Sequence, residues 1–579
     1  MSVFISNVDD FISPAQACVN PYVAARGTDA AAASTTASSS NKVTLKADFS
    51  ATEFEAVAVR PSLIRQKASS SSDASKVAAV SLNDCLACSG CVTSAETVLI
   101  QEQSTDKLLL RLADGGSSAR VIVTISPQSR ASIASHLSLL ASSEGEPPVD
   151  GAQTFLCLAA WLKQLGAHYV FDTSAAGDIA LLETRQEFLD QCGGSSDSSY
   201  TRAKFQAPGV ATIPVSSTRV QIVSRASDGS AAVGAAFFSH SADPRQEFAD
   251  ISSMPRYSCK LPLLVSHCPG WVCYAEKTTP AAIPFMSTAK SAQQIVGAVA
   301  KQLLAPLEST SFYVVSVEPC FDKKLEGSRK DFFHEDSGEG DVDLVISTSE
   351  LWLMVESLSG LAGAAAARWL LAKGRDDPAG RDGFEALFRS HSRDGRQMLM
   401  ASDDGGSGGY VQHLASHAAR QALGAIETRV EVVPGRNADI TEYIVHDARD
   451  ASKQLKFAKV YGFRNIQSLM IKMKRGSCDL AFVEIMACPG GCVNGGGQLK
   501  SSHRETPAET RARTDRVSRA LHGCAEVREP AEAPLAHWLY SGQGGLAGGP
   551  GGPEAKALLH TRFHAVPKLE VIAPLATKW

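Results

Sequence analysis

The sequence FVEIMACPGGCVNGGGQ, residues 482–498, places two cysteines directly after a run that ends as a strand does. Cys488 and Cys492 lie among Pro and Gly residues, where the backbone turns tightly and can approach a bound group closely. Loops that follow strands are where α/β folds place their chemistry. This stretch therefore predicts a site with two thiols at the carboxyl end of a strand.

Two earlier segments have the same form. SHCPGW at 266–271 and VEPCFDKKLE at 317–326 each place one cysteine after a predicted strand. Backbone N–H groups in such loops can donate to cluster sulfides and tune their potential. Each segment alone is a common turn, but the three segments in this order are highly specific. The four thiols of the predicted site are Cys268, Cys320, Cys488 and Cys492.

A second cysteine group lies near the beginning of the sequence, in DCLACSGC at 84–91. Cys85, Cys88 and Cys91 have the spacing C-x2-C-x2-C, which suits three ligands on one face of a cubane cluster. A [4Fe–4S] cluster needs a fourth ligand, and Cys18 is the best remote candidate. The alternatives are a zinc site, which usually takes paired C-x2-C units, and three unligated thiols. The pattern favours iron–sulfur over both.

The rest of the chain alternates between strand-like and helix-like segments. This alternation predicts an α/β fold with a largely parallel sheet covered by helices. The predicted strands are residues 121–126, 168–172, 261–266, 312–317 and 342–347. The predicted helices are residues 153–165, 178–189 and 287–304.

Composition excludes several classes of function. The chain has 579 residues, 44% of them hydrophobic, and a formal net charge of −5. It therefore has material for a core but no basic footprint for nucleic acid. Its longest apolar stretch is too short for a membrane span, and we expect no secretory or transit signal at the N-terminus. The cytosol is then the expected compartment, so the 14 cysteines are expected to be reduced.

Ala/Ser-rich and Gly/Ser/Pro-rich tracts interrupt the pattern. Such tracts bury too little apolar surface to offset chain entropy, so we interpret them as linkers or surface loops. They are residues 29–40, 68–75, 193–200, 402–409 and 542–553.

The motif order SHCPGW, VEPCFDKKLE, DVDLVIST and FVEIMACPGGCVNGGGQ resembles the catalytic domain of [FeFe]-hydrogenases. More closely, it resembles the eukaryotic hydrogenase-like proteins of cytosolic iron–sulfur assembly, the NARF family. Further matches are DDFISPAQACVNP, SPQSRASIA, YGFRNIQ and HTRFHAVPKLEV. The resemblance covers nearly the whole chain apart from the low-complexity tracts.

This resemblance implies a hydrogenase-like α/β core with mainly parallel sheets flanked by helices. The core is expected at 113–579, with insertions at about 193–260, 373–410 and 540–555. A small N-terminal iron–sulfur segment is expected at 1–112, with a disordered insert at about 27–78.

The resemblance also implies two [4Fe–4S] clusters. An exposed N-terminal cluster would be held by Cys18, Cys85, Cys88 and Cys91. A buried core cluster would be held by Cys268, Cys320, Cys488 and Cys492. In hydrogenases, the cysteine that matches Cys492 also bridges to a binuclear iron subcluster.

Two departures from hydrogenases argue against hydrogen turnover. His267 stands where hydrogenases have the proton-passing cysteine of Cys-Cys-Pro-Gly-Trp, and the N-terminus lacks the full ferredoxin-like set of cysteines. Lys323 and Met486 do match residues of the binuclear site. An active [FeFe]-hydrogenase therefore remains the alternative to the expected role, which is a non-enzymatic assembly factor.

That role is a carrier and adaptor, which passes clusters from the early scaffold to the late targeting complex for cytosolic and nuclear apoproteins. The expected partners are proteins of these two assemblies, with no nucleic acid and no membrane. Trp579 at the C-terminus resembles the aromatic tail that docks some proteins on the targeting complex. The expected location is the cytoplasm, with the nucleus as a second compartment.

Overall fold

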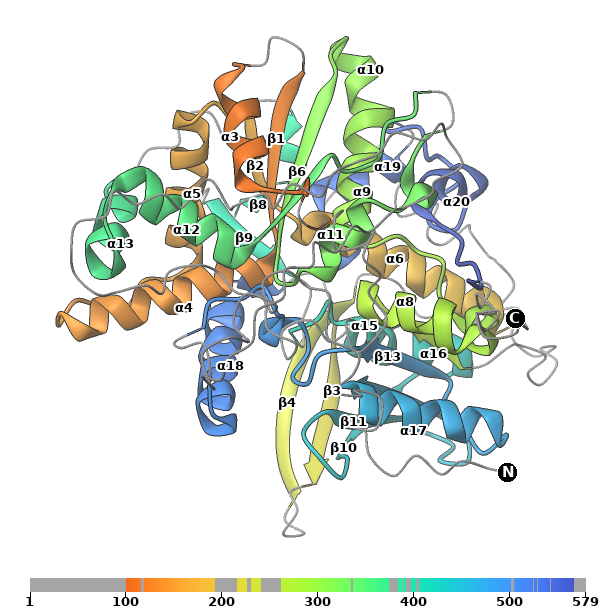
Figure 1. Ribbon diagram of the computed structural model, residues 1–579. Coiled ribbons are helices and arrows are strands. Elements are labelled where there is room, and N and C mark those ends of the chain that lie inside the picture. Colours follow the sequence, from red (N-terminus) through yellow and green to blue (C-terminus); the bar gives the residue numbers. More distant parts are fainter. Residues whose placement is uncertain are drawn as a thin grey trace, which may run out of the picture.

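The computed structural model describes residues 100–566 with gaps, and Figure 1 draws the arrangement. The gaps are residues 101, 116–118, 193–215, 226–230, 241–261, 335–336, 374–383, 389, 392–396, 402–405, 501–504, 524, 528 and 542. The N-terminal ligand candidates and Trp579 therefore lie outside the described residues. Within the described ranges, every helix falls short of the length and apolar character that a bilayer crossing needs.

The first sheet has four parallel strands in the order β2-β1-β6-β7, in the upper half of Figure 1. They are β1 (Arg120–Ile125), β2 (Tyr169–Asp172), β6 (Phe312–Glu318) and β7 (Leu344–Ser347). Their residues are mostly apolar and almost all buried, as parallel strands covered on both faces require. The strands predicted at 121–126, 168–172, 312–317 and 342–347 are confirmed.

Helices cover both faces of this sheet. Val121, Val123 and Ile125 of β1 pack against α3, α4, α5, α12 and α13 on one face. Ile122 points the opposite way, into a second core with α6 and α9 that also contains Phe457 of the other sheet. This second core therefore lies between the two sheets. The helices are α3 (Thr105–Ala113), α4 (Pro127–Ser143), α5 (Gly151–Gln164), α6 (Ser174–Gln191), α9 (Ala292–Ala298), α12 (Thr348–Ser359) and α13 (Gly363–Leu371).

Capping side chains fix where helices leave this sheet. The Ser126 hydroxyl accepts from the Ser129 amide, so α4 begins immediately after β1. Ser347 and Glu350 form a capping box, which starts α12 directly after β7. These helix starts, together with that of α6 after β2, place polar side chains at the carboxyl edge of the sheet.

The second sheet has seven strands in the order β4-β3-β10-β11-β12-β13-β5, in the lower half of Figure 1. They are β3 (Ser216–Arg225), β4 (Ala231–His240), β5 (Leu263–Val265), β10 (Thr428–Pro434), β11 (Ile440–Asp447), β12 (Gln454–Tyr461) and β13 (Phe482–Met486). β12, β13 and β5 are parallel, whereas β10, β11 and β12 pair antiparallel. This sheet is therefore mixed, while the first is wholly parallel.

Three tracts interpreted from sequence as inserted loops have defined structure in part. The predicted insertion at 193–260 contains β3 and β4, an antiparallel pair at the edge of the seven-stranded sheet. In the tract at 542–553, Leu546 is buried in the core and Gly551 bonds to the buried Glu183. In the tract at 402–409, Ser407 is fully buried. Composition alone does not distinguish a glycine-rich surface loop from one that packs closely.

The remaining elements complete the layers around the two sheets. The helices are α8 (Pro269–Thr278), α10 (Ala305–Glu308), α11 (Asp322–Gly327), α14 (Phe384–Phe388), α15 (Tyr410–His413), α16 (Ala419–Leu423), α17 (Phe463–Lys474), α18 (Pro507–His522), α19 (Pro534–Tyr540) and α20 (Pro553–Leu559). A small third sheet contains β8 (Ser390–His391), β9 (Gln397–Ala401) and β14 (Ala525–Val527). The 3-10 turns are η4 (Pro280–Phe285), η6 (Lys330–Phe332), η8 (Cys492–Asn494) and η9 (Pro530–Glu532), and the π-helical turns are η5 (Val299–Leu304) and η7 (Leu414–Ala418).

The predicted helix at 287–304 begins later and changes pitch along its length. The structure has α9, then the π-helical η5, then α10. The predicted helices at 153–165 and 178–189 are confirmed as α5 and α6.

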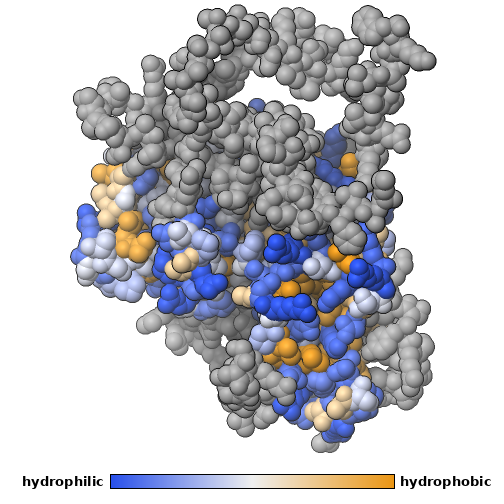
Figure 2. All heavy atoms as spheres, turned by 60° about the horizontal axis from the view of Figure 1, so that its bottom comes forward, coloured by the Kyte–Doolittle hydropathy of each residue, from blue (hydrophilic) through white to orange (hydrophobic). Residues whose placement is uncertain are grey.

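Figure 2 shows the face that lies at the bottom of Figure 1. On its coloured part, apolar residues form small patches separated by hydrophilic ones. Across the described residues, the two most exposed large apolar side chains, Leu110 and Leu307, lie on different helices, α3 and α10. Single exposed apolar side chains of this kind are normal on a protein surface.

Candidate metal centre

Cys268 lies at the junction of β5 and α8, where it is the N-cap residue. The Ser266 hydroxyl donates to the carbonyl oxygen of Ile485 at 2.5 Å and accepts from the Cys268 amide at 3.1 Å. This contact links the end of β5 to β13 beside it. Burial raises the pKa of the Cys268 thiol above its ordinary value. Backbone N–H groups of Ala487, Trp271 and Gly270 donate to this thiol and partly oppose the shift.

Cys320 follows β6, which belongs to the four-stranded sheet. The strands that precede the other core cysteines, β5 and β13, belong to the seven-stranded sheet. Its loop is in close contact with the glycine-rich end of the Cys488–Cys492 segment. A Cβ atom at Gly495 would lie 2.3 Å from the Pro319 carbonyl oxygen. The sequence needs glycine there because the two loops otherwise could not approach each other.

Cys488 and Cys492 follow β13 in a compact turn. The Gly491 amide donates to the Cys488 carbonyl oxygen at 3.0 Å, and Cys492 begins η8. The Cys492 amide donates to the Ser407 hydroxyl at 2.9 Å. This hydrogen bond joins the turn to Ser407, which lies far away in the sequence.

The structure brings the four predicted core cysteines into one region. Cys268 is buried and the other three are partly buried. Burial raises the pKa of the Cys320 thiol well above its usual range, and the charges of Asp322 and the three other thiols raise it further. Burial, followed by Cys268 and Cys492, raises the pKa of the Cys488 thiol in the same way. The other three thiols are thus close enough to Cys320 to disfavour ionisation of its sulfur.

Four thiols from three loops are donors of the kind that iron–sulfur clusters take. Among the described residues, no three His, Cys, Asp or Glu side chains converge closely enough to hold one metal ion. A cubane cluster places each thiolate on a different iron, so its ligands stand further apart. A bound metal also favours the thiolate form, which removes the cost of ionising several buried thiols together.

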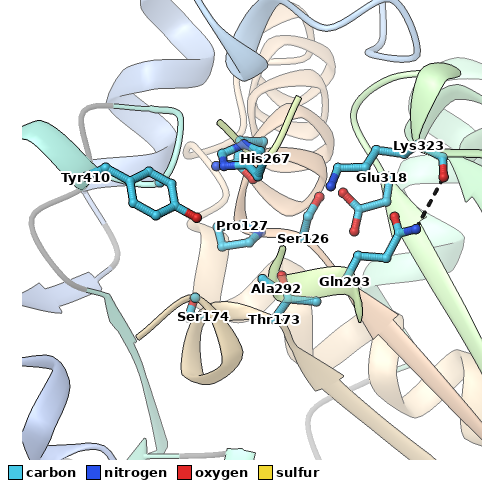
Figure 3. A pocket seen from close by; sticks show the side chains of 13 residues that line it. Ser126, Pro127, Thr173, Ser174, His267, Ala292, Gln293, Glu318, Lys323 and Tyr410 are labelled. Carbon is cyan, nitrogen blue, oxygen red and sulfur yellow. Dashed lines mark hydrogen bonds between the residues drawn. The ribbon is translucent and has the colours of Figure 1, made fainter. Parts of the chain in front are cut away.

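A cavity of about 70 Å³ with several polar side chains in its lining lies beside this centre, and Figure 3 shows these side chains. Lys323 and Glu318 enter it from the β6–α11 segment, and Ser126, Ser174 and Gln293 enter it from helix starts. Lys323 Nζ lies 2.7 Å from Glu326 Oε2. Burial raises the pKa of Glu318 to about 7, although Lys323 and Ser316 oppose this shift.

His267 and Tyr410 form another part of the cavity wall in Figure 3. His267 Nε2 lies 3.2 Å from Cys492 Sγ. Burial, followed by the charge of Lys323, lowers the pKa of His267 to about 3, so the ring is neutral at physiological pH. Met486 is fully buried, with its sulfur 3.9 Å from Cys492 Sγ.

Sequence reasoning missed the segment 406–410 as part of the site. Its Gly/Ser-rich composition predicts a surface loop, yet Ser407 bonds Cys492 and both Gly408 and Tyr410 line the cavity. Nothing in the periodicity or spacing of this tract distinguishes it from the other glycine-rich tracts. Of the eight predicted ligands, the four core cysteines are brought together, and the four N-terminal ones lie outside the described residues.

Comparison with known proteins agrees with this architecture. Residues 241–496 match the family described as iron only hydrogenase large subunit, C-terminal domain. The fold is similar to that of a solved [FeFe]-hydrogenase, HydA1 from Chlamydomonas reinhardtii. The TM-score is 0.53, with 24% identity over 80% of this chain and 98% of the hydrogenase chain.

Similarity to curated proteins extends over the whole chain. It is 35% identical to the cytosolic iron-sulfur assembly component 3 of Rattus norvegicus, covering 99% of this chain and 98% of that protein. It is 33% identical to the cytosolic Fe-S cluster assembly factor narfl of Xenopus tropicalis, with the same coverage of 99% and 98%. It is 33% identical to Protein NAR1 of Arabidopsis thaliana, covering 84% of this chain and 86% of that protein. The chain therefore belongs to the family of hydrogenase-like cytosolic iron–sulfur assembly factors.

Proposed function

We propose that this protein is a cytosolic iron–sulfur cluster assembly factor that carries two [4Fe–4S] clusters. The names of relatives about one-third identical along nearly the full chain support the assembly role. The names point to an assembly factor rather than a hydrogenase, although the fold is hydrogenase-like. We propose that it has no hydrogenase activity.

The core cluster is assigned to Cys268, Cys320, Cys488 and Cys492. The observation that carries this assignment is the convergence of thiols from three loops on two sheets, with the other three thiols acting on Cys320. The indole N–H of Trp271 supports it, because this donor is buried without an acceptor among the described residues. Cluster sulfides are acceptors of the kind that such a donor lacks.

The N-terminal cluster is assigned to Cys18, Cys85, Cys88 and Cys91, and this assignment rests on their sequence pattern. We propose that transfer of cargo occurs at this site by thiolate exchange. Each iron–thiolate bond that breaks is replaced by a bond to a thiolate of the acceptor, so the step needs no net oxidation or reduction. The core cluster has a structural role, because its ligands join distant segments.

The proposed partners are the early scaffold and the late targeting complex, both in the cytoplasm, with the nucleus as a second compartment. Trp579 is the proposed docking element for the targeting complex, through its ring and terminal carboxylate. Deleting Trp579 should then weaken binding to the purified targeting complex while leaving iron content unchanged. Equal binding by the full and shortened chains would remove this part of the proposal.

Anaerobic iron and acid-labile sulfide analysis, with infrared spectra of the same sample, tests the main proposal. We expect about eight irons and eight sulfides, the sum of two cubanes, without CO or CN bands. Additional iron with CO and CN bands would favour an active hydrogenase. Stoichiometric zinc without sulfide would contradict both functions.

Transfer itself is tested with a purified apoprotein that needs a [4Fe–4S] cluster for activity. The loaded protein should restore that activity, and Cys88→Ala should abolish the restoration. The exposed-site proposal fails if Cys88→Ala transfers cluster as well as the unchanged chain does.

A further inference from the structure

His267 makes a close contact with a proposed ligand of the core cluster. Its Nε2 atom lies 3.2 Å from Cys492 Sγ, whereas the Met486 sulfur is further away, at 3.9 Å. Nε2 carries a proton in one neutral tautomer and also in the charged ring, so the contact can be a hydrogen bond in either state. With Cys492 as a thiolate ligand, which has no proton to give, the imidazole is the donor and the sulfur is the acceptor.

The ring of His267 is held in place by the segment 406–410. Gly408 has a φ of +101°, and a Cβ atom there would lie 2.7 Å from Tyr410 Cε2 and 3.1 Å from His267 Cε1. The backbone therefore lies directly against the imidazole, which only glycine allows. Ser407 in the same segment accepts from the Cys492 amide. One loop thus fixes both the donor ring and the cysteine.

The neighbouring Tyr410 ring also restricts the imidazole. The Tyr410 ring centroid lies 5.9 Å from that of His267, and both side chains face the cavity in Figure 3. The orientation that aims Nε2 at the sulfur is consequently built into the fold and does not rely on a flexible side chain.

We propose that His267 is a positioning residue that donates a hydrogen bond to Cys492 Sγ and raises the reduction potential of the core cluster. This inference rests on the proposed function, because Cys492 must be a cluster ligand. A hydrogen bond to a ligand sulfur stabilises the more negative, reduced state.

The test uses the full chain carrying Cys88→Ala, so that the core cluster dominates the spectrum of the reduced protein. Histidine labelled with heavy nitrogen should give a weak nitrogen coupling in the pulsed paramagnetic resonance spectrum. His267→Leu should abolish this coupling and shift the midpoint potential to a lower value. His267→Gln, which keeps an N–H donor, should lose the histidine coupling but keep most of the potential.

His446→Leu on β11 is the matched control, because it makes the same change at a histidine away from the site. It should leave both the coupling and the potential unchanged. Absence of a histidine coupling in the protein that retains His267 would overturn the inference, even if His267→Leu fails to hold a cluster. Equal midpoint potentials in the protein that retains His267 and in the His267→Leu variant would also overturn it.

The two proposals fail in distinguishable ways. A normal cluster spectrum without histidine coupling contradicts only the role of His267. Absence of core iron and sulfide in the Cys88→Ala protein contradicts the proposed function and this inference together.

Discussion

The Gly497 amide donates a hydrogen bond of 2.8 Å to the Pro319 carbonyl oxygen, which joins the loop after β13 to the loop after β6. Pro319 immediately precedes Cys320, and Gly497 follows Cys492 by one short turn. The contact thus connects the cysteine of the four-stranded sheet with those of the seven-stranded sheet.

Gly495→Ala should disturb this junction. The added Cβ would lie 2.3 Å from the Pro319 carbonyl oxygen, and a backbone atom cannot move away as a flexible side chain can. We expect a loss of about 1–3 kcal/mol of stability, typical of overpacking, and lower iron content. Thermal unfolding and iron analysis measure both. Gly177→Ala, where nothing lies within 4 Å, is the control and should cause neither loss.

Cys488→Ala should lower both the melting temperature and the iron content. Its thiol is part of the group that joins the two sheets, so loss of the cluster removes a folding constraint. We expect loss of about half of the iron, the share of one cubane out of two. Cys478→Ala, at a thiol with no motif partner, should leave iron unchanged. A Cys488→Ala protein with normal iron and melting temperature would contradict the core assignment.

Cys88→Ala provides the complementary result. Cys88 belongs to the proposed exposed site, so its replacement should remove about half of the iron with little change in melting temperature. Calorimetry with iron analysis compares it with Cys488→Ala. Identical losses of melting temperature in both variants would contradict the division into a structural and a transfer site.

His413 should lower the free energy of unfolding in acid. Burial, followed by the charges of His417 and Arg185, lowers the pKa of His413 well below its usual 6.5. Below pH 6.5 the unfolded chain takes up a proton that the folded protein does not, so stability falls as pH falls. The slope reaches at most about 1.4 kcal/mol per pH unit.

His413→Leu should therefore flatten the acid side of the stability curve, as measured by melting temperature against pH. An exposed residue that does not titrate offers a control, since Leu110→Ala should give a curve parallel to that of the unchanged protein. Parallel curves for His413→Leu as well would contradict this explanation.

Glu183→Ala should release the C-terminal part of the core. The buried Glu183 carboxylate accepts hydrogen bonds from the Tyr540 hydroxyl at 2.5 Å and the Gly551 amide at 2.8 Å. It also contacts His560 Nε2 at 3.0 Å. Leaving these groups without a partner costs about 1–3 kcal/mol. Limited proteolysis should then cleave near residues 543–566, while the cluster spectrum is unchanged.

The control for Glu183→Ala is Asp190→Ala on the same helix. Asp190 pairs with Lys556 at 3.5 Å, where the side chains are 31% and 54% exposed, and ion pairs near the surface contribute little. Equal proteolysis of the two variants would show that Glu183 has no special role in holding this segment.

Much of the fold and the core site could be predicted from sequence because the signals are local. Apolar runs identify β1, β2, β6 and β7, and a cysteine in a Pro/Gly turn follows three strands. Parallel strands align their carboxyl ends, which explains why motifs far apart in sequence meet. Cys268 and Cys488 meet in this way, since β5 and β13 are neighbours.

Other features could not be predicted because they depend on long-range packing. Ser407 lies in a tract whose composition is typical of an exposed loop, and its burial is decided by contact with Cys492. The β3–β4 pair lies in the stretch predicted as an insertion, and it joins the sheet through β10. The His267 contact likewise depends on the segment 406–410, which the sequence does not connect to Cys492.

The distribution of the core cysteines over two sheets has a consequence for biosynthesis. During translation, Cys268 and Cys320 leave the ribosome well before β13 and its two cysteines are made. The proposed ligand set is therefore incomplete until almost the whole core has emerged. A cluster held by all four cysteines can therefore be inserted only after Cys492 has emerged, and Cys268 and Cys320 must still be reduced at that time.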